Sequence, residues 1–249
     1  MRRLLIAFAI AALFPITSQA TTFAQLALGG GYETVLLITN KTIFYWRGTI
    51  WVSRAYNQKW EGTWAVNGQD HTGKESVKID VAPRGLLKLR FTGDGTTRAG
   101  YLEIDADSTY SELNVAVSYF YEFRKAGELQ DTIGSPESAL GKKFVFAVEK
   151  TDAIDTGFAW CPSSRYNSTP FRIDLLLYDQ NGSIPRLKTV TFTGHQAQFV
   201  TEVFTDLPST FVGYLVIESQ NDLYLEVLRI EKTPTGFQLT STPADNYVP

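Results

Sequence analysis

The sequence holds a single cysteine, Cys161, and only two histidines, His71 and His195. One cysteine cannot form a disulfide within the chain, so the fold must rest on its hydrophobic core. A metal site built from imidazole and thiolate needs several such ligands close together, and the two histidines lie in opposite halves of the sequence. The sequence therefore predicts no disulfide, no metal site and no cofactor.

Long apolar runs are missing after the first residues of the chain. Residues 4–14 are apolar but too few to span a bilayer as a helix, for which about 20 residues are needed. They follow Arg2 and Arg3 and precede a polar stretch that ends at Ala20, which is the pattern of a secretory signal. We expect residues 1–20 to be a signal peptide. The mature protein should be secreted, periplasmic or extracellular, without stable membrane insertion.

An excess of positive charge is absent as well. The chain has 23 Lys and Arg and 26 Asp and Glu, a net charge of −3, and loss of Arg2 and Arg3 with the signal peptide makes this −3 − 2 = −5. Nucleic acids and anionic membrane surfaces attract basic proteins. The charge therefore argues against both as partners and leaves an unknown protein or glycan.

What the sequence does contain is a succession of short β-strand patterns. Residues 34–39, 77–81 and 171–175 are β-branched or alternate between apolar and polar residues, and turns rich in Gly, Asn, Asp and Pro separate such runs. We find no amphipathic helix of normal length. We therefore predict an all-β fold made of Greek-key-like β-sandwiches.

The two halves of the chain share an order of landmarks. Residues 100–104 (GYLEI) match residues 213–217 (GYLVI), and each segment is followed by a polar turn and a second strand pattern. This similarity predicts two tandem modules related by an internal repeat. The expected units are a first β-sandwich module at 21–140 and a second at 141–249, joined near residues 136–142. One continuous sandwich built from both halves is the alternative.

Three consecutive glycines, Gly29, Gly30 and Gly31, raise the question of a phosphate-binding loop. Such a loop lies between a strand and the N-terminus of a helix, whereas a strand pattern follows here and no Lys-Ser or Lys-Thr pair is present. The glycines are better explained by a tight turn that needs positive φ angles.

The same segment carries a resemblance. The pattern FAQxAxGGGYxT, residues 23–34, resembles the opening of a bacterial secreted tandem β-sandwich family of unknown function. The resemblance extends over nearly the whole mature chain and implies two related modules, but no catalytic residues come with it. The second half departs from the opening motif.

Few residues indicate chemistry. His71 and His195 lie in polar, turn-like segments, and no Gly-x-Ser-x-Gly motif accompanies them, so we expect no catalytic triad and a non-catalytic protein. Asp105 and Asp107 could place oxygen ligands around calcium, but the segment lacks the glycine and terminal acid of a full calcium loop. The simpler interpretation is that these acidic residues lie in a solvent-exposed turn.

Aromatic residues are the strongest candidates for ligand contact. Trp46, Trp51 and Trp60 crowd one part of the first half, and strand alternation turns Trp51 outward while Ile50 and Val52 face inward. These tryptophans either pack in the core or offer a platform to a sugar or peptide. The first hypothesis is therefore a structural or adhesive interaction protein. A carbohydrate-binding module is the second hypothesis, and an enzyme of unidentified class is the third.

Overall fold

The structure is a computed structural model, and it describes residues 20–53, 60–163, 169–183, 186–192, 194–233, 236–242 and 244–246. Of the expected signal peptide, all but Ala20 lies outside these residues. The predicted all-β fold is confirmed, because the described chain is mostly antiparallel strands with two short helical turns. No helix among the described residues is long and apolar enough to cross a membrane.

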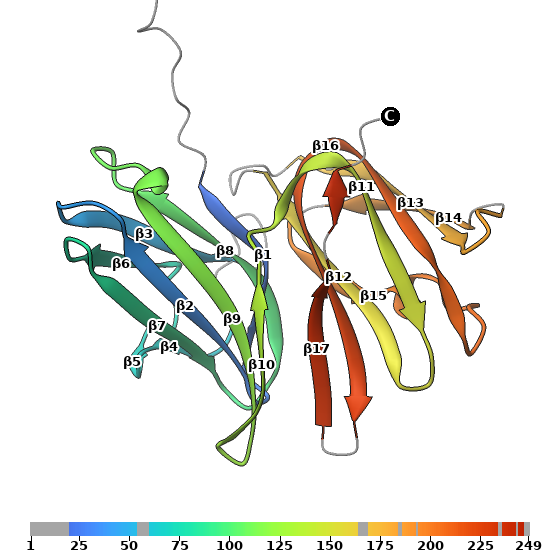
Figure 1. The fold of residues 1–249 in the computed structure, drawn as a ribbon, viewed down its shortest axis with the longest axis horizontal. Helices are drawn as coiled ribbons and strands as arrows, with labels where there is room; N and C mark the ends of the chain where they lie inside the picture. Colours follow the sequence, from blue (N-terminus) through green and yellow to red (C-terminus); the bar gives the residue numbers. More distant parts are fainter. Residues whose placement is uncertain are drawn as a thin grey trace, which may run out of the picture.

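The described residues of the first half form ten strands and one 3-10 helix (Figure 1). Their bounds are β1 Thr21–Leu28, β2 Tyr32–Asn40, β3 Trp46–Ser53, β4 Trp64–Val66, β5 Gln69–Asp70, β6 Ser76–Val81, β7 Leu86–Gly93, β8 Arg98–Ala106, η1 Glu112–Asn114, β9 Val115–Lys125 and β10 Glu128–Ser135. A four-stranded sheet has the order β1-β8-β3-β6, and a six-stranded sheet has the order β10-β9-β2-β7-β4-β5. The two sheets pack face to face as a sandwich.

Side chains alternate between the inner and outer faces along the strands, and the inward ones form the core of this sandwich. In β3, Trp46, Ile50 and Val52 are buried, while Arg47 on the opposite face is exposed. The inward residues of both sheets join one apolar cluster that runs from Phe23 to Ile133. Burial of such a face is the main force that holds two sheets together.

In the second half, the part of the chain that the structure describes forms eight strands and one short helix. Their bounds are β11 Ala139–Lys150, β12 Ile154–Pro162, β13 Phe171–Asp179, β14 Arg186–Phe192, β15 Gln196–Phe199, α1 Val200–Val203, β16 Phe211–Thr233, β17 Gly236–Thr242 and β18 Asp245–Asn246. The long β16 connects the layers: its first part pairs with β11 and β13, and its second part pairs with β12 and β17. A separate core cluster, from Phe144 to Val227, lies between them.

The sequence predicted a polar turn at residues 219–222 between two strands of the second half. The structure instead carries these residues inside β16, where the pairing with β11 shifts between Gly141 and Lys143. The side chain of Ser219 bridges the irregularity by donating to the carbonyl oxygen of Asn221 at 2.7 Å. The segment is a bulge in one continuous strand because β11 spans both sides of it.

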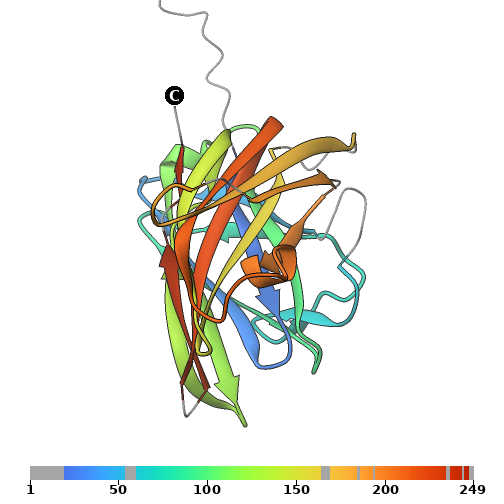
Figure 2. The same ribbon diagram turned by 90° about the vertical axis from the view of Figure 1, so that its right-hand side faces the viewer.

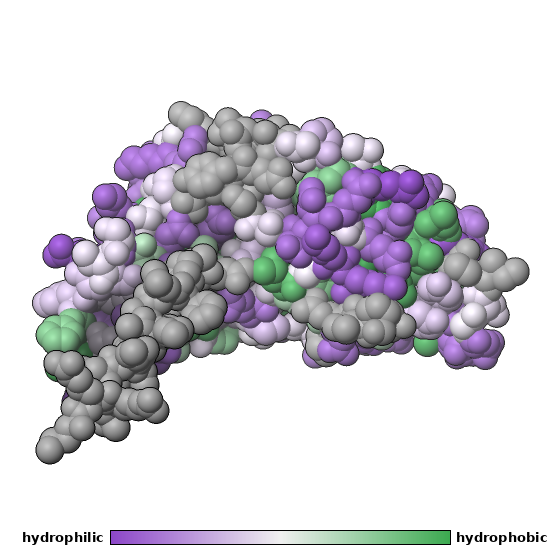
Figure 3. Space-filling model, turned by 90° about the horizontal axis from the view of Figure 1, so that it is seen from above, coloured by the Kyte–Doolittle hydropathy of each residue, from purple (hydrophilic) through white to green (hydrophobic). Residues whose placement is uncertain are grey.

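The two halves pack directly against each other (Figures 1 and 2). β1 contacts β12 and β16, and β10 contacts β17. Only residues 136–138 of the predicted linker lie outside strands, since β11 already begins at Ala139. Seen from above, the halves form one arched body whose upper face is largely polar over the second half (Figure 3).

Candidate functional site

Two of the three tryptophans proposed as a platform are buried. Trp46 and Trp60 are 0% and 3% exposed and belong to the core of the first half. Trp46 lies against Gly48 and donates its indole N–H to the carbonyl oxygen of Ser111 at 3.0 Å. A ring enclosed in this way has no face for a sugar, so Trp46, Trp51 and Trp60 do not assemble the platform considered from the sequence.

The outward orientation predicted for Trp51 is confirmed. Ile50 and Val52 are buried in the core, and Trp51 between them is half-buried on the other face of the sheet. Its register partner on β8 is Glu103, which is itself buried. Trp51 therefore lies beside a polar, covered position rather than on an open aromatic surface.

The histidines are separated in space as in sequence. The ring of His71 packs on Trp64 with centroids 5.1 Å apart, and the ring of His195 stacks on Tyr101 at 6.3 Å. Burial lowers the pKa of His71, and nearby Lys74 adds to this effect. Within the described part of the chain, no group of three or more His, Cys, Asp and Glu side chains could hold a metal ion.

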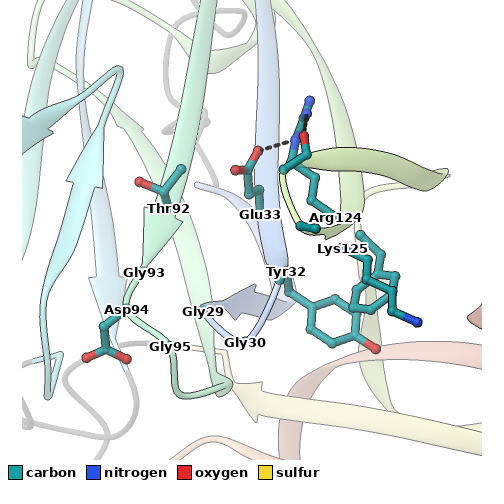
Figure 4. Close-up of a pocket in the computed structure, with 14 residues that line it drawn as sticks. Gly29, Gly30, Tyr32, Glu33, Thr92, Gly93, Asp94, Gly95, Arg124 and Lys125 are labelled. Atoms are coloured by element: carbon teal, nitrogen blue, oxygen red, sulfur yellow. Dashed lines mark hydrogen bonds and ion pairs between the residues drawn. The ribbon is translucent and has the colours of Figure 1, made fainter.

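The glycine turn forms the wall of an open hollow of about 670 Å³ (Figure 4). Gly29, Gly30 and Gly31 have φ angles of 81°, 61° and 98°, and β2 follows them, so the tight-turn interpretation is confirmed. A Cβ atom on Gly31 would lie 2.4 Å from the carbonyl oxygen of Arg124. These glycines therefore serve conformation and close approach of the chain.

Charges around this hollow are balanced. Arg124 pairs with Glu33 at 3.0 Å, as Figure 4 shows, and with Glu122 at 2.9 Å. Arg90 pairs with the same two carboxylates. Burial tends to raise the pKa of Glu122, but hydrogen bonds from Arg90 and Arg124 outweigh this effect and lower it. Both guanidinium groups are therefore occupied by carboxylates.

A different surface stands out at the far end of the first half. Five large apolar side chains there are between 58% and 73% exposed, and we call this surface the apolar tip: Ile43, Phe44, Tyr45, Leu86 and Leu113. They come from the β2–β3 connection, the start of β7 and η1. In Figure 3 the left edge of this half shows a small apolar group among hydrophilic residues.

Asn40 fixes the loops of the apolar tip. Its side-chain amide donates to the carbonyl oxygens of Phe44 at 2.7 Å and of Val81 at 3.1 Å, which ties the β2–β3 connection to the end of β6. The amide of Lys41 donates to the carbonyl oxygen of Asn114 at 2.9 Å, which adds η1. The apolar side chains are thus held on an ordered backbone.

A buried carboxylate joins the two halves. Glu226 of β16 is 4% exposed, and four donors to it from the described residues belong to the first half or the linker. Its carboxylate accepts from Tyr121 at 2.6 Å, Ser135 at 2.8 Å, the backbone amide of Gln25 at 3.3 Å and Ser138 at 3.4 Å. Four neutral donors satisfy a buried charge in place of a counter-ion.

The surroundings of Glu226 shift its titration. Burial raises its pKa from 4.5 to about 7, and the hydrogen bonds from Tyr121 and Ser135 limit the rise. From β12, Cys161 faces the same junction, and its pKa is raised well above the ordinary value by burial, then by Glu103 and Glu226. Tyr119 and Tyr121 on β9 have raised pKa values for the same two reasons, burial and the Glu226 charge.

Beside Glu226 a cleft of about 310 Å³ opens between the halves. Strands β1, β2 and β9 form one wall, and β12, β15, β16 and β17 form the other. Its aromatic lining consists of Tyr32, Tyr121 and Phe199. Phe158 borders it too, but the ring of Phe158 packs against Phe146 and Trp160 in the core of the second half. Pockets with apolar walls and a few convergent polar groups are typical ligand sites.

Comparisons of the chain with protein-family models, with curated proteins and with solved structures give no match. The resemblance of residues 23–34 to a bacterial secreted family therefore stays a prediction, as does the internal repeat.

Sequence reasoning missed Glu226 and the apolar tip. Glu226 interrupts the otherwise apolar run Leu223–Leu228, and an acid inside such a run signals a buried, partnered charge. For the tip, the run Ile43-Phe44-Tyr45 directly after Asn40 falls in a connection rather than a strand. Neither signal reveals which distant residues would join it.

Proposed function

We propose that this is a non-catalytic, exported β-sandwich protein with a structural or adhesive role, and that it contacts a protein partner through the apolar tip. The observation that carries this proposal is that five exposed apolar side chains come from segments at one end of the first half that hydrogen bonds of Asn40 and Lys41 hold together. Exposed patches of this kind mark interaction sites. A preordered backbone also lowers the entropic cost of binding.

The charges beside the tip favour a particular kind of partner surface. Lys41 and Arg84 are exposed and lie in the same loops, since the amide of Arg84 donates to the carbonyl oxygen of Thr42 at 2.9 Å. An apolar centre with basic residues at its rim is complementary to an apolar pocket with an acidic rim. We therefore expect a protein surface of that character as the partner.

The junction between the halves supports the structural side of the role. Glu226 receives hydrogen bonds from β1, β9, β10 and the linker, so the second half is attached to the first at four points. Such an attachment holds the tip at a fixed position relative to the second half. The glycan hypothesis has less support, because Trp46 and Trp60 have no exposed ring face.

The test is a comparison of binding by matched variants. The double variant Phe44→Ser, Leu113→Ser removes the two most exposed members of the apolar tip, and Leu187→Ser removes a 59% exposed leucine on β14. Immobilised mature protein is mixed with an envelope extract of the source organism, and the captured proteins are quantified. We expect the tip variant to lose about tenfold or more of a specific protein that the wild type and Leu187→Ser retain. Equal capture by all three proteins would contradict the proposal.

A further inference from the structure

The charged side chains that line the cleft between the halves are all acidic among the residues that the structure describes. Glu226 and Glu202 line it, and no Lys, Arg or His from the described ranges does so. Arg229 is the basic residue nearest in sequence on β16, but strand alternation places it on the opposite face, where it pairs with Glu149 and Glu231. The cleft therefore disfavours an anion and is complementary to a cation.

The walls are also suited to a cation. Tyr32, Tyr121 and Phe199 line the cleft, and the negative potential over an aromatic face attracts ammonium groups. Phe199 packs over Gly157, and its ring would lie 3.5 Å from a Cβ atom placed on that glycine. Leu228, Ile230 and Leu239 complete an apolar lining for the body of a ligand.

One amide group adds hydrogen-bonding capacity. Gln25 lines the cleft, and its buried side-chain oxygen has no hydrogen-bond partner among the residues that the structure describes. A buried acceptor without a partner is unfavourable, so a ligand that donates to it would bind more tightly. Gln25 therefore supplies an acceptor for an N–H group. Gln198 also borders the cleft, but its side chain lies on the other face of the sheet, where it pairs with Phe158 in register and accepts from Gln196.

We propose that the cleft binds a small organic cation, an amine carried on an apolar or aromatic body. The aromatic walls and the leucine and isoleucine side chains enclose the body, while the ammonium group lies toward Glu226 and the oxygen of Gln25. The cleft is at the small end of the range for ligand pockets, so the ligand is a compact molecule rather than a folded chain. This site is independent of the apolar tip.

Protonation of Glu226 provides a second signature of the site. A carboxylate whose pKa is near 7 is largely protonated at pH 6 and largely ionised at pH 8, and a bound cation favours the ionised form. Cation binding should therefore strengthen as the pH rises through this range. The other titratable groups at the cleft and the junction are Glu103, Glu137, Glu202, Cys161, His195, Tyr32, Tyr101, Tyr119, Tyr121 and Tyr224. Raised pKa values keep the tyrosines Tyr32, Tyr119 and Tyr121 and the thiol of Cys161 neutral in this pH range.

Three probes of similar shape and different charge test the proposal. Binding of 2-phenylethylamine, 2-phenylethanol and 3-phenylpropionate to the mature protein is measured by calorimetry at pH 6 and pH 8. We expect the amine to bind about tenfold or more tightly than the alcohol at pH 8, more weakly at pH 6, and the carboxylate to bind least. Equal affinity for amine and alcohol, or no saturable binding of the amine, would overturn the proposal.

Variants assign the binding to the cleft. Glu226→Gln should remove most of the preference for the amine and its pH dependence, whereas Glu218→Gln, on the part of β16 away from the cleft, should retain both. If Glu226→Gln does not fold, Phe199→Ala provides the test at a half-buried wall position and should weaken amine binding about tenfold. Unchanged amine binding in a folded cleft variant would show that the amine binds elsewhere and refute the assignment.

Discussion

Raising the pH from about 5 to about 8 should destabilise the native protein through Glu226. The pKa of this carboxyl is 4.5 in its ordinary state and about 7 in the folded protein, so the folded state holds the proton more tightly than the unfolded state does. A group of this kind contributes stability at low pH that is lost as the pH rises through the folded pKa. Because the two pKa values differ by 7 − 4.5 = 2.5, and a difference of one is worth about 1.4 kcal/mol, the full effect is about 3 to 4 kcal/mol.

The assay is urea unfolding of wild type and Glu226→Gln across this pH range. Other carboxyl groups titrate too, but they are common to both proteins, so the difference between the two free energies of unfolding isolates Glu226. We expect that difference to change by about 2 to 3 kcal/mol in favour of the glutamine variant between pH 5 and pH 8. Glu218→Gln, at an exposed position of the same strand, should show no such trend. A difference that stays constant within about 0.5 kcal/mol would refute the reasoning.

Three further outcomes follow from the packing. Gly31→Ala should lower the free energy of unfolding by about 2 kcal/mol or more in urea titrations, because the new Cβ atom would collide with the carbonyl oxygen of Arg124 and the residue has a φ of 98°. The control Gly95→Ala, whose Cβ atom would meet no other atom, should leave the free energy of unfolding nearly unchanged. Cys161 should resist a thiol reagent in the folded protein and react after unfolding, because it is fully buried and its pKa is raised. Rapid stoichiometric labelling of the native protein would contradict the burial of Cys161. Phe44→Ser should leave stability within about 0.5 kcal/mol of wild type by thermal unfolding, because the side chain is 71% exposed; a larger loss would mean that it packs.

Local patterns predicted the elements of this fold well. Alternation in residues 50–52 correctly separated the inward Ile50 and Val52 from the outward Trp51, because strand periodicity is a local property. The glycine turn before β2 was also predictable, since a requirement for positive φ can be read from three consecutive glycines. Polar residues 219–222 were predicted as a turn, and the continuity of β16 depends on pairing with β11, which is distant in sequence.

The candidate sites were much less predictable. Trp46 and Trp60 are of the residue type that forms sugar-binding platforms. Whether they are exposed depends on which strands cover them, and this is determined by the three-dimensional packing. Glu226 is a buried, hydrogen-bonded residue of the junction because Tyr121, Ser135 and Ser138 donate to its carboxylate. These residues are about 90 to 105 positions away in sequence. The apolar tip likewise combines three connections that Asn40 and backbone hydrogen bonds bring together.

The measurement that tests the proposed contact surface most directly is site-specific photo-crosslinking. A benzophenone amino acid is introduced in place of Phe44 in the apolar tip, and in a matched protein in place of Leu187 on β14, since both positions are well exposed. Each full chain is expressed in the source organism and irradiated. We expect a discrete crosslinked protein from position 44 and none from position 187. Crosslinks of equal yield from both positions, or none from position 44, would contradict a contact through the apolar tip.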